Sequence, residues 1–231
     1  DQPRSRGLGD VYKRQVHIAD IACGSGIFLE EAFSYLQNYC VQKYLANGEQ
    51  EHLLEIGNGS YKLPLDEKKR ILCSCIYGID IDIHAVEVAK FSLLIKLIEN
   101  ETAPSVADET PILPDLSTNI LFGNSLVSSE ELHGIRASAD DLIELAPFDW
   151  NSINNGNPFS VIIGNPPYVN TEGMHALLPI PEVEIYKKKY KTSHKQFDKY
   201  FIFIEQAVQK TAENGYILSL IHISEPTRPR L

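Results

Sequence analysis

Four consecutive residues, Asn165-Pro166-Pro167-Tyr168, have the types and order best suited to chemistry, and they directly follow the apolar run 161–164. The two prolines fix an extended backbone and carry no N–H, which leaves the Pro166 carbonyl as an outward-facing acceptor. Asn165 adds a neutral side-chain acceptor, and Tyr168 adds a flat ring. An exocyclic amine on a nucleic-acid base fits this set, because two acceptors can hold its hydrogens while the ring stacks on the extruded base. The alternative is a rigid turn with a buried tyrosine.

A glycine turn follows the apolar run 16–22, within the sequence DIACGSGIFL at 20–29. Gly24 and Gly26 allow a sharp turn that brings backbone N–H groups close to a ligand at the start of a helix. The dinucleotide fingerprint G-x-G-x-x-G expects a third glycine where this chain has Leu29, which disfavours NAD or FAD. A turn of this kind can also be purely structural.

An acidic pair, Asp80 and Asp82, follows the apolar run that begins at Ile76. A carboxylate at the end of the second strand of a nucleotide-binding sheet can accept both hydroxyl hydrogens of a ribose. We assign that role to Asp80, with Ile81 as an apolar surface for an adenine ring. For Asp82 we favour a structural role at the N-terminus of the next helix.

The elements that must position these residues alternate between strands and helices. Short apolar runs predict strands at 16–22, 76–82, 120–122 and 160–164, with a further strand beginning at 215. Apolar residues at helical spacing predict helices over 29–44 (ended by Asn47-Gly48), 66–75 (capped by Asp66), 84–98 and 196–212, with a helical stretch near 140–145. Residues 48–65 are polar and contain glycine, which predicts a surface excursion, and residues 99–118 are predicted to be a loop. This alternation predicts an α/β fold with a parallel sheet covered on both faces and a ligand at the carboxyl ends of its strands.

The composition is that of a globular protein, with 231 residues, 43% hydrophobic and 23% charged. No apolar run approaches about 18 residues, so we expect no membrane span. The four cysteines lack metal-ligand pairing, which predicts no metal site and favours a reducing cytoplasm. The net charge of -10 is unusual for a protein that works on nucleic acid. A lysine run over 187–199 could meet phosphates or could be a solvated face.

The two ends are related at the level of codons. Residues 10–15 can be encoded by GAT GTG TAT AAG AGA CAG, whose reverse complement encodes residues 218–223, and the relation extends over residues 2–15 and 218–231. The string resembles the adapter of transposase-based sequencing libraries. We therefore predict that 1–15 and 218–231 are translated adapter and that 16–217 is part of a longer catalytic domain, truncated at both ends.

Four ordered motifs, DIACGSGIFL, YGIDIDIHAVEVAKFSL, ILFGNSL and VIIGNPPYV, resemble those of S-adenosylmethionine-dependent adenine-specific DNA methyltransferases. The similarity is to the fused type II restriction-modification enzymes and related phage-defence systems. It implies a Rossmann-like class I methyltransferase fold, S-adenosyl-L-methionine as cofactor, and transfer of a methyl group to the N6 amine of adenine. The implied partner is double-stranded DNA with a flipped adenine, with a recognition domain elsewhere in a longer protein. The fragment alone is expected to be inactive.

The resemblance also implies roles for individual residues, at positions 20, 22–26, 80, 81, 124 and 165–168. The cofactor's methionine end would be held by Asp20 and the backbone of Ala22, Cys23, Gly24 and Gly26. Asp80 would hold the ribose, Ile81 would pack on the adenine, and Asn124 would lie near the adenine amine. Asn165, Pro166, Pro167 and Tyr168 would form the target-adenine site. This chain has Ile21 where many members have proline, and Asn124 where many have aspartate.

Two alternatives remain open. A methyltransferase acting on a glutamine side-chain amide of a protein uses the same Asn-Pro-Pro-Tyr logic. The other alternative, from a different class, is a nucleotide-binding scaffold without catalysis.

Overall fold

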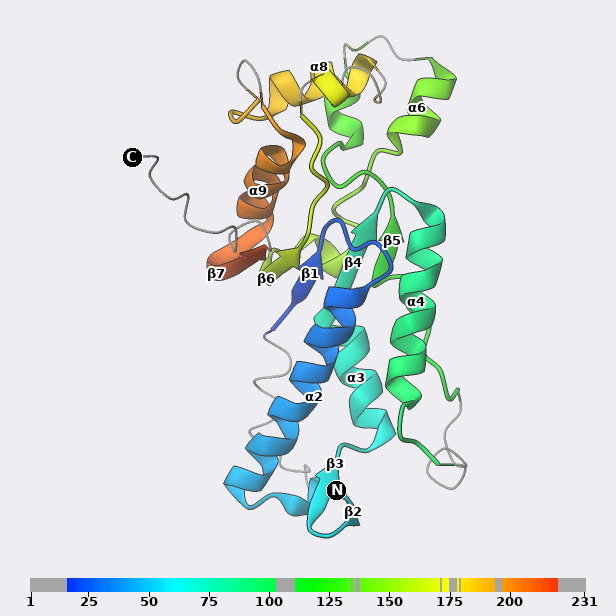
Figure 1. Cartoon of the computed structure of the whole chain (residues 1–231), viewed down its shortest axis with the longest axis vertical. Helices are drawn as coiled ribbons and strands as arrows, with labels where there is room; N and C mark the ends of the chain where they lie inside the picture. Colours follow the sequence, from blue (N-terminus) through cyan, green and yellow to red (C-terminus); the bar gives the residue numbers. More distant parts are fainter. Residues whose placement is uncertain are drawn as a thin grey trace, which may run out of the picture.

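The computed structural model describes residues 16–102, 111–133, 135, 138–170, 172–174, 178, 180–193 and 197–219 (Figure 1). Predictions that fall on the remaining residues, including most of both adapter-like ends, Lys195, Gln196 and part of the 99–118 loop, lie outside this description.

Five parallel strands form the central sheet, in the order β5-β4-β1-β6-β7. They are β1 (Ile18–Asp20), β4 (Ile76–Asp80), β5 (Ile120–Phe122), β6 (Phe159–Gly164) and β7 (Thr211–Ser219). Their registers align the strand ends: Asp20 lies beside Gly78 and Ile163, and Asp80 lies beside Phe122. The predicted parallel α/β sheet is confirmed.

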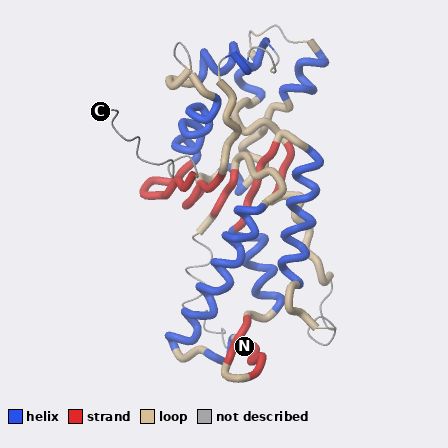
Figure 2. The backbone as a smooth tube through the Cα atoms, viewed as in Figure 1, coloured by secondary structure: helices blue, strands red, loops and turns tan. Residues whose placement is uncertain are grey.

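Helices cover both faces of this sheet, as the alternation of strand side chains requires. Ile18 and Ile76 belong to a core formed with α2 (Ile27–Asn47), α3 (Leu65–Cys75) and α4 (Ile83–Ile98). Ala19 and Tyr77, their neighbours along the strands, belong to the opposite core with α8 (Ile180–Lys189) and α9 (Lys199–Lys210). Figure 2 shows the strands between these two groups of helices.

Helix α2 follows the glycine turn, and both its buried face and its end agree with the sequence prediction. It buries Leu29, Phe33, Cys40 and Tyr44, which recur at helical spacing. It ends at Asn47 because Gly48 takes the left-handed conformation and donates its N–H to the carbonyls of the last turn. The predicted end of this helix is confirmed.

The predicted cap of α3 was wrong. The N-cap of α3 is Pro64, and Asp66 lies in its first turn rather than at the cap. The segment 48–65, expected to be a surface excursion, contains η1 (Gln50–His52) and a hairpin of β2 (Leu54–Gly57) and β3 (Ser60–Lys62), whose residues are exposed or partly exposed. Helix α8 was not predicted from the sequence. Within the described ranges the remaining elements are η2 (Ser129–Leu132), η3 (Asn154–Gly156) and α6 (Ala139–Leu145), the last as expected.

Candidate functional site

The candidate residues meet at one edge of the sheet. Asp20 and Asp80 are the last residues of β1 and β4, and Asn124 and Asn165 come within two residues after β5 and β6. These four strands are neighbours and parallel, so their carboxyl ends lie together. The structure therefore brings together Asp80, Asn124 and Asn165, which the sequence places at strand ends, and Asp20, whose role comes from the family resemblance.

The glycine turn is held tightly against the sheet. The Cys23 N–H donates to the Ile79 carbonyl at 3.0 Å, and the Gly26 N–H donates to the Cys23 carbonyl at 2.9 Å. Gly26 has a φ of +88°, and a Cβ there would lie 3.0 Å from the Cβ of Ala89, so only glycine allows this approach of α2 to α4. A Cβ on Gly24 would meet nothing within 4 Å. The space above Gly24 is open to a ligand.

Asp80, the last residue of β4, connects this strand to the glycine turn. Its Oδ2 accepts the Gly24 N–H at 2.7 Å, and its Oδ1 accepts the Asp82 N–H at 2.9 Å. Each carboxylate oxygen keeps a lone pair for a further donor. Asp82 itself caps α4 by accepting the His84 N–H at 2.8 Å, which confirms its structural role. Ile81, between the two aspartates, is 46% exposed.

Asp20 is almost fully buried, at 1% exposure. Burial is the main cause that raises the pKa of Asp20 to about 7, and the charge of Asp80 raises it further, against the hydrogen bond from the Ala22 N–H at 3.0 Å. A Cβ at Gly164 would lie 2.7 Å from Asp20 Oδ1. The glycine before Asn165 therefore abuts this carboxylate and brings the Asn-Pro-Pro-Tyr segment next to the glycine turn.

The Asn-Pro-Pro-Tyr segment leaves the sheet with its polar end and its ring accessible. Asn165 and Pro167 are exposed, Pro166 is buried, and Tyr168 is 62% exposed. The alternative of a rigid turn with a buried tyrosine is therefore wrong. Beyond Tyr168, the Val169 carbonyl accepts the N–H of Lys199 at 2.8 Å, which fixes the segment to the N-terminus of α9.

Asn124 lies in a buried position after β5. Its Oδ1 accepts the Leu126 N–H at 3.1 Å, and its Nδ2 donates to Glu182 at 3.2 Å. The neighbouring Ser125 hydroxyl donates to the Ile21 carbonyl at 2.6 Å and ties this loop to the glycine turn. The place of Asn124 near an adenine amine stays a prediction.

A buried ion pair behind the site had no counterpart in the sequence predictions. Glu182 of α8 accepts from Lys199 of α9 at 3.1 Å, and both side chains are at most 10% exposed. The same carboxylate accepts from the Asn124 amide and the Tyr186 hydroxyl. Burial and the Glu182 charge raise the pKa of Tyr186 well above its usual range. This cluster links the loop after β5 to α9, and hence to Val169.

The lysine run divides into two groups. Lys199 is buried against Glu182, and Lys189 pairs with Glu131 at 3.0 Å, so both have structural partners. Lys187, Lys188 and Lys191 are exposed and remain open to phosphates or solvent.

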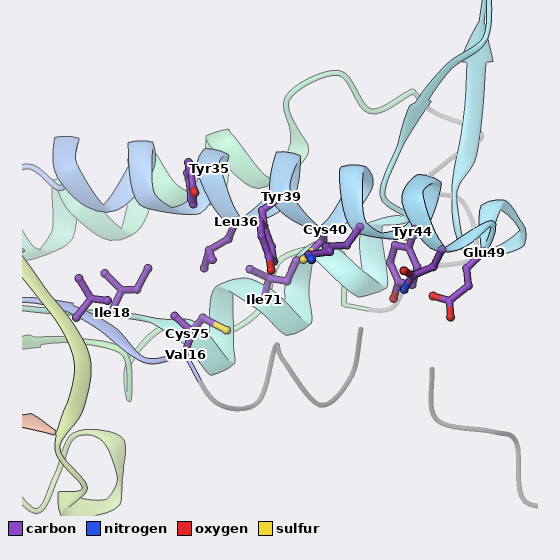
Figure 3. A pocket seen from close by; sticks show the side chains of 13 residues that line it. Val16, Ile18, Tyr35, Leu36, Tyr39, Cys40, Tyr44, Glu49, Ile71 and Cys75 are labelled. Carbon is purple, nitrogen blue, oxygen red and sulfur yellow. The ribbon is translucent and has the colours of Figure 1, made fainter. Parts of the chain in front are cut away.

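A separate apolar cavity of about 310 Å³ lies between α2, α3 and the sheet. Its lining includes Val16, Ile18, Tyr35, Tyr39, Cys40 and Cys75 (Figure 3). These residues come from the helical face and the start of β1, so the cavity is not part of the carboxyl edge. Over the described residues, no group of three or more His, Cys, Asp or Glu is placed to hold a metal ion, and no helix has the length and apolarity to span a bilayer.

The sheet order, the helices on both faces and the residues at the carboxyl edge define a Rossmann-like α/β fold. The chain belongs to the Eco57I restriction-modification methylase family, whose model matches residues 74–228. The resemblance to fused type II restriction-modification enzymes is thereby confirmed. The matched span includes 218–228, so it does not mark a boundary at 217.

The chain is 46% identical over 212 residues to the type II restriction enzyme and methyltransferase RM.Eco57I of Escherichia coli. That match covers 92% of this chain but 20% of the relative, so this chain spans about a fifth of the relative's length.

Two solved structures have a similar fold. One is a nuclease-deletion mutant of the Type ISP restriction-modification enzyme LlaGI in complex with a DNA substrate mimic, with a TM-score of 0.51, 19% identity, and coverage of 92% of this chain and 16% of that one. The other is the ATP-dependent Type ISP enzyme LlaBIII bound to DNA, with a TM-score of 0.51, 18% identity, and coverage of 89% and 13%.

Proposed function

We propose that this chain is the catalytic segment of a larger restriction-modification enzyme that transfers a methyl group from S-adenosyl-L-methionine to the N6 amine of adenine in DNA. The observation that carries the proposal is the position of Asn165-Pro166-Pro167-Tyr168. This segment starts next to the buried Asp20 carboxylate and presents an exposed amide and an exposed ring at the carboxyl edge.

The residues at this edge fit the cofactor. The open space above Gly24 and the lone pairs left on Asp80 are what a bound nucleoside with ribose hydroxyls requires. Asp20 and the backbone of 22–26 would hold the methionine end, Asp80 the ribose, and Ile81 the adenine face, with Asn124 near the adenine amine. S-adenosylmethionine supplies a methyl group already activated by a sulfonium centre.

The target adenine would be held by the chain's own acceptors. Asn165 Oδ1 and the Pro166 carbonyl would each accept one hydrogen of the N6 amine, which draws the nitrogen lone pair out of conjugation with the ring. Tyr168 would stack on the base after it leaves the duplex. Exposure of Asn165 and Tyr168 is the condition for both contacts.

The proposal extends to the rest of the protein. Residues 1–15 and 218–231 would be adapter-derived, and the DNA-recognition domain would lie in a longer, cytoplasmic polypeptide. Sequencing the source locus tests this: genomic codons for both ends would overturn the adapter assignment.

The test of function is single-turnover methylation by the complete protein, with labelled S-adenosylmethionine, unmethylated plasmid DNA and EDTA. We expect the label on adenine N6, and a reduction of about a hundredfold or more for Asn165→Ala, because one preorganised polar group is lost from the transition state. Asn58→Ala, in the turn of the distant β2–β3 hairpin, is the control.

The digested products discriminate between the functions. Label on cytosine, or on a glutamine of an added release-factor-type protein, would refute the adenine assignment. A complete protein that binds cofactor but transfers no label would favour the nucleotide-binding alternative.

A further inference from the structure

A second aromatic side chain lies beside Tyr168. The ring of Tyr200, in the first turn of α9, has its centroid 6.2 Å from that of Tyr168, with an angle of 47° between the two planes. Tyr200 is partly exposed, and Phe201 next to it is 43% exposed. The proposed function uses Tyr168 and leaves Tyr200 without a role.

The backbone fixes this arrangement independently of the rings. The Asp198 carboxylate accepts the N–H of Val169 at 3.2 Å and the N–H of Tyr200 at 3.3 Å. Asn170 and Asp198 form an antiparallel bridge, so the chain after Tyr168 runs alongside the start of α9. Residues 168 and 200 are therefore held on adjacent segments by the Asp198 carboxylate and by the main-chain bridge.

Lys199 adds a constraint on direction. Its side chain points into the protein, where it pairs with Glu182. Successive residues of a helix point about 100° apart, so Tyr200 is turned away from this buried pair. The buried lysine thus helps to set the side on which the Tyr200 ring emerges.

The geometry of the two rings leaves Tyr168 free to stack. Rings tilted by 47° at this distance are not parallel, so Tyr200 does not cover Tyr168 as a stacked partner would. An aromatic ring that stays partly exposed beside a stacking platform is suited to contact a base placed on that platform.

We propose that Tyr200 is a second contact for the flipped target base. The Tyr200 ring touches the base beside the stacking face of Tyr168 and thereby selects for a base in the catalytic orientation. This inference rests on the proposed function and adds a specificity-determining residue to it. The contact is made by the ring, so the hydroxyl of Tyr200 is dispensable.

The test uses the complete protein and a duplex carrying its recognition sequence, read from the positions methylated in plasmid DNA. We expect Tyr200→Ala to lower the single-turnover rate by about tenfold or more, the loss typical of one base-stacking contact. Tyr200→Phe should keep most of the rate, and the Kd for S-adenosylmethionine should stay within about twofold of wild type in both. Tyr35→Ala is the matched control, since Tyr35 is 68% exposed on α2, away from the carboxyl edge.

Two further measurements separate a base contact from support of Tyr168. With 2-aminopurine at the target position, the fluorescence gain on binding should fall for Tyr200→Ala and persist for Tyr200→Phe. The double variant Tyr168→Ala/Tyr200→Ala should be slower than Tyr168→Ala alone. A double variant no slower than Tyr168→Ala would overturn the inference, and so would wild-type rates for Tyr200→Ala. Label on cytosine or protein in the wild type would instead refute the proposed function.

Discussion

The buried carboxylate of Asp20 makes a prediction about pH. Burial raises the pKa of Asp20 to about 7, and the groups that face it are acidic or neutral: Asp80, whose charge raises it further, and the Cys23 thiol, itself held protonated by burial and by both carboxylates. In the proposed function Asp20 faces the cationic methionine end of the cofactor. Only the ionised carboxylate attracts that cation, so cofactor affinity should fall as the pH drops below 7.

The size of the effect follows from the titration. With a pKa of about 7, Asp20 is ionised in roughly 72% of molecules at about pH 7.4 and in roughly 9% at about pH 6. The cofactor affinity should therefore fall roughly eightfold over this interval. Asp20→Asn removes the titrating group while its amide oxygen can still accept the Ala22 N–H, so this variant should bind more weakly at the higher pH but lose the eightfold dependence.

The assay is calorimetric titration of S-adenosylmethionine into wild type, Asp20→Asn and Asp140→Asn at both pH values. Asp140 is an exposed carboxylate in the first turn of α6 and serves as the control. Comparing ratios between variants cancels the titration of the ligand's own amino group, which has a pKa of about 8. The reasoning is refuted by an equal pH ratio in wild type and Asp20→Asn.

Other predictions concern the stability of the fold and the packing of Gly164 against Asp20. The pKa of Asp20 in the folded protein lies above its unfolded value of 3.8. The stability that Asp20 contributes is therefore complete below pH 3.8 and is lost as the pH rises through about 7. Asp20→Asn should raise the thermal midpoint at pH 8 and leave it unchanged at pH 4. Lys199→Met leaves Glu182 buried without its cation and should cost about 3 to 5 kcal/mol in urea unfolding, and the double variant Glu182→Gln/Lys199→Met should recover part of this; equal losses in both would contradict the pairing. Gly164→Ala places a methyl group against Asp20 and should weaken cofactor binding in the same titration, whereas Gly57→Ala, with open space around its Cβ, should not.

The carboxyl edge could be predicted from the sequence because its signals are local. An apolar run that ends in aspartate or glycine identifies a buried strand and its end, and parallel strands bring those ends together whatever the rest of the chain does. Asp80, Asn124 and Asn165 were placed in this way, whereas Asp20 lies inside the strand predicted over 16–22 and was assigned a role only from the family resemblance. The positive φ angles of Gly24 and Gly26 also agree with the turn expected from the sequence.

The buried cluster behind the site could not be predicted in the same way. Asn124 and Glu182 are 58 residues apart, and Glu182 and Lys199 lie in segments whose charges favour a solvent-exposed assignment. A buried charge depends on a partner that only the fold supplies. The signal was the helical spacing of Val183 and Tyr186 in α8, which the neighbouring lysines obscured.

Helix α4 shows why periodicity alone does not choose a buried face. The apolar residues whose helical spacing predicts this helix include Val88, Phe91, Ile95 and Ile98 on one face, yet all four are at least 38% exposed. The helix instead buries Val86, Ala89, Leu93 and Leu97, because it is apolar on more than one side. Ala89, on this buried face, has a small side chain and lies so close to Gly26 that a Cβ on Gly26 would come within 3.0 Å of the Ala89 Cβ. The glycine turn therefore selects the face of α4, and that choice holds Asp80 and Asp82 beside the turn at the start of the helix.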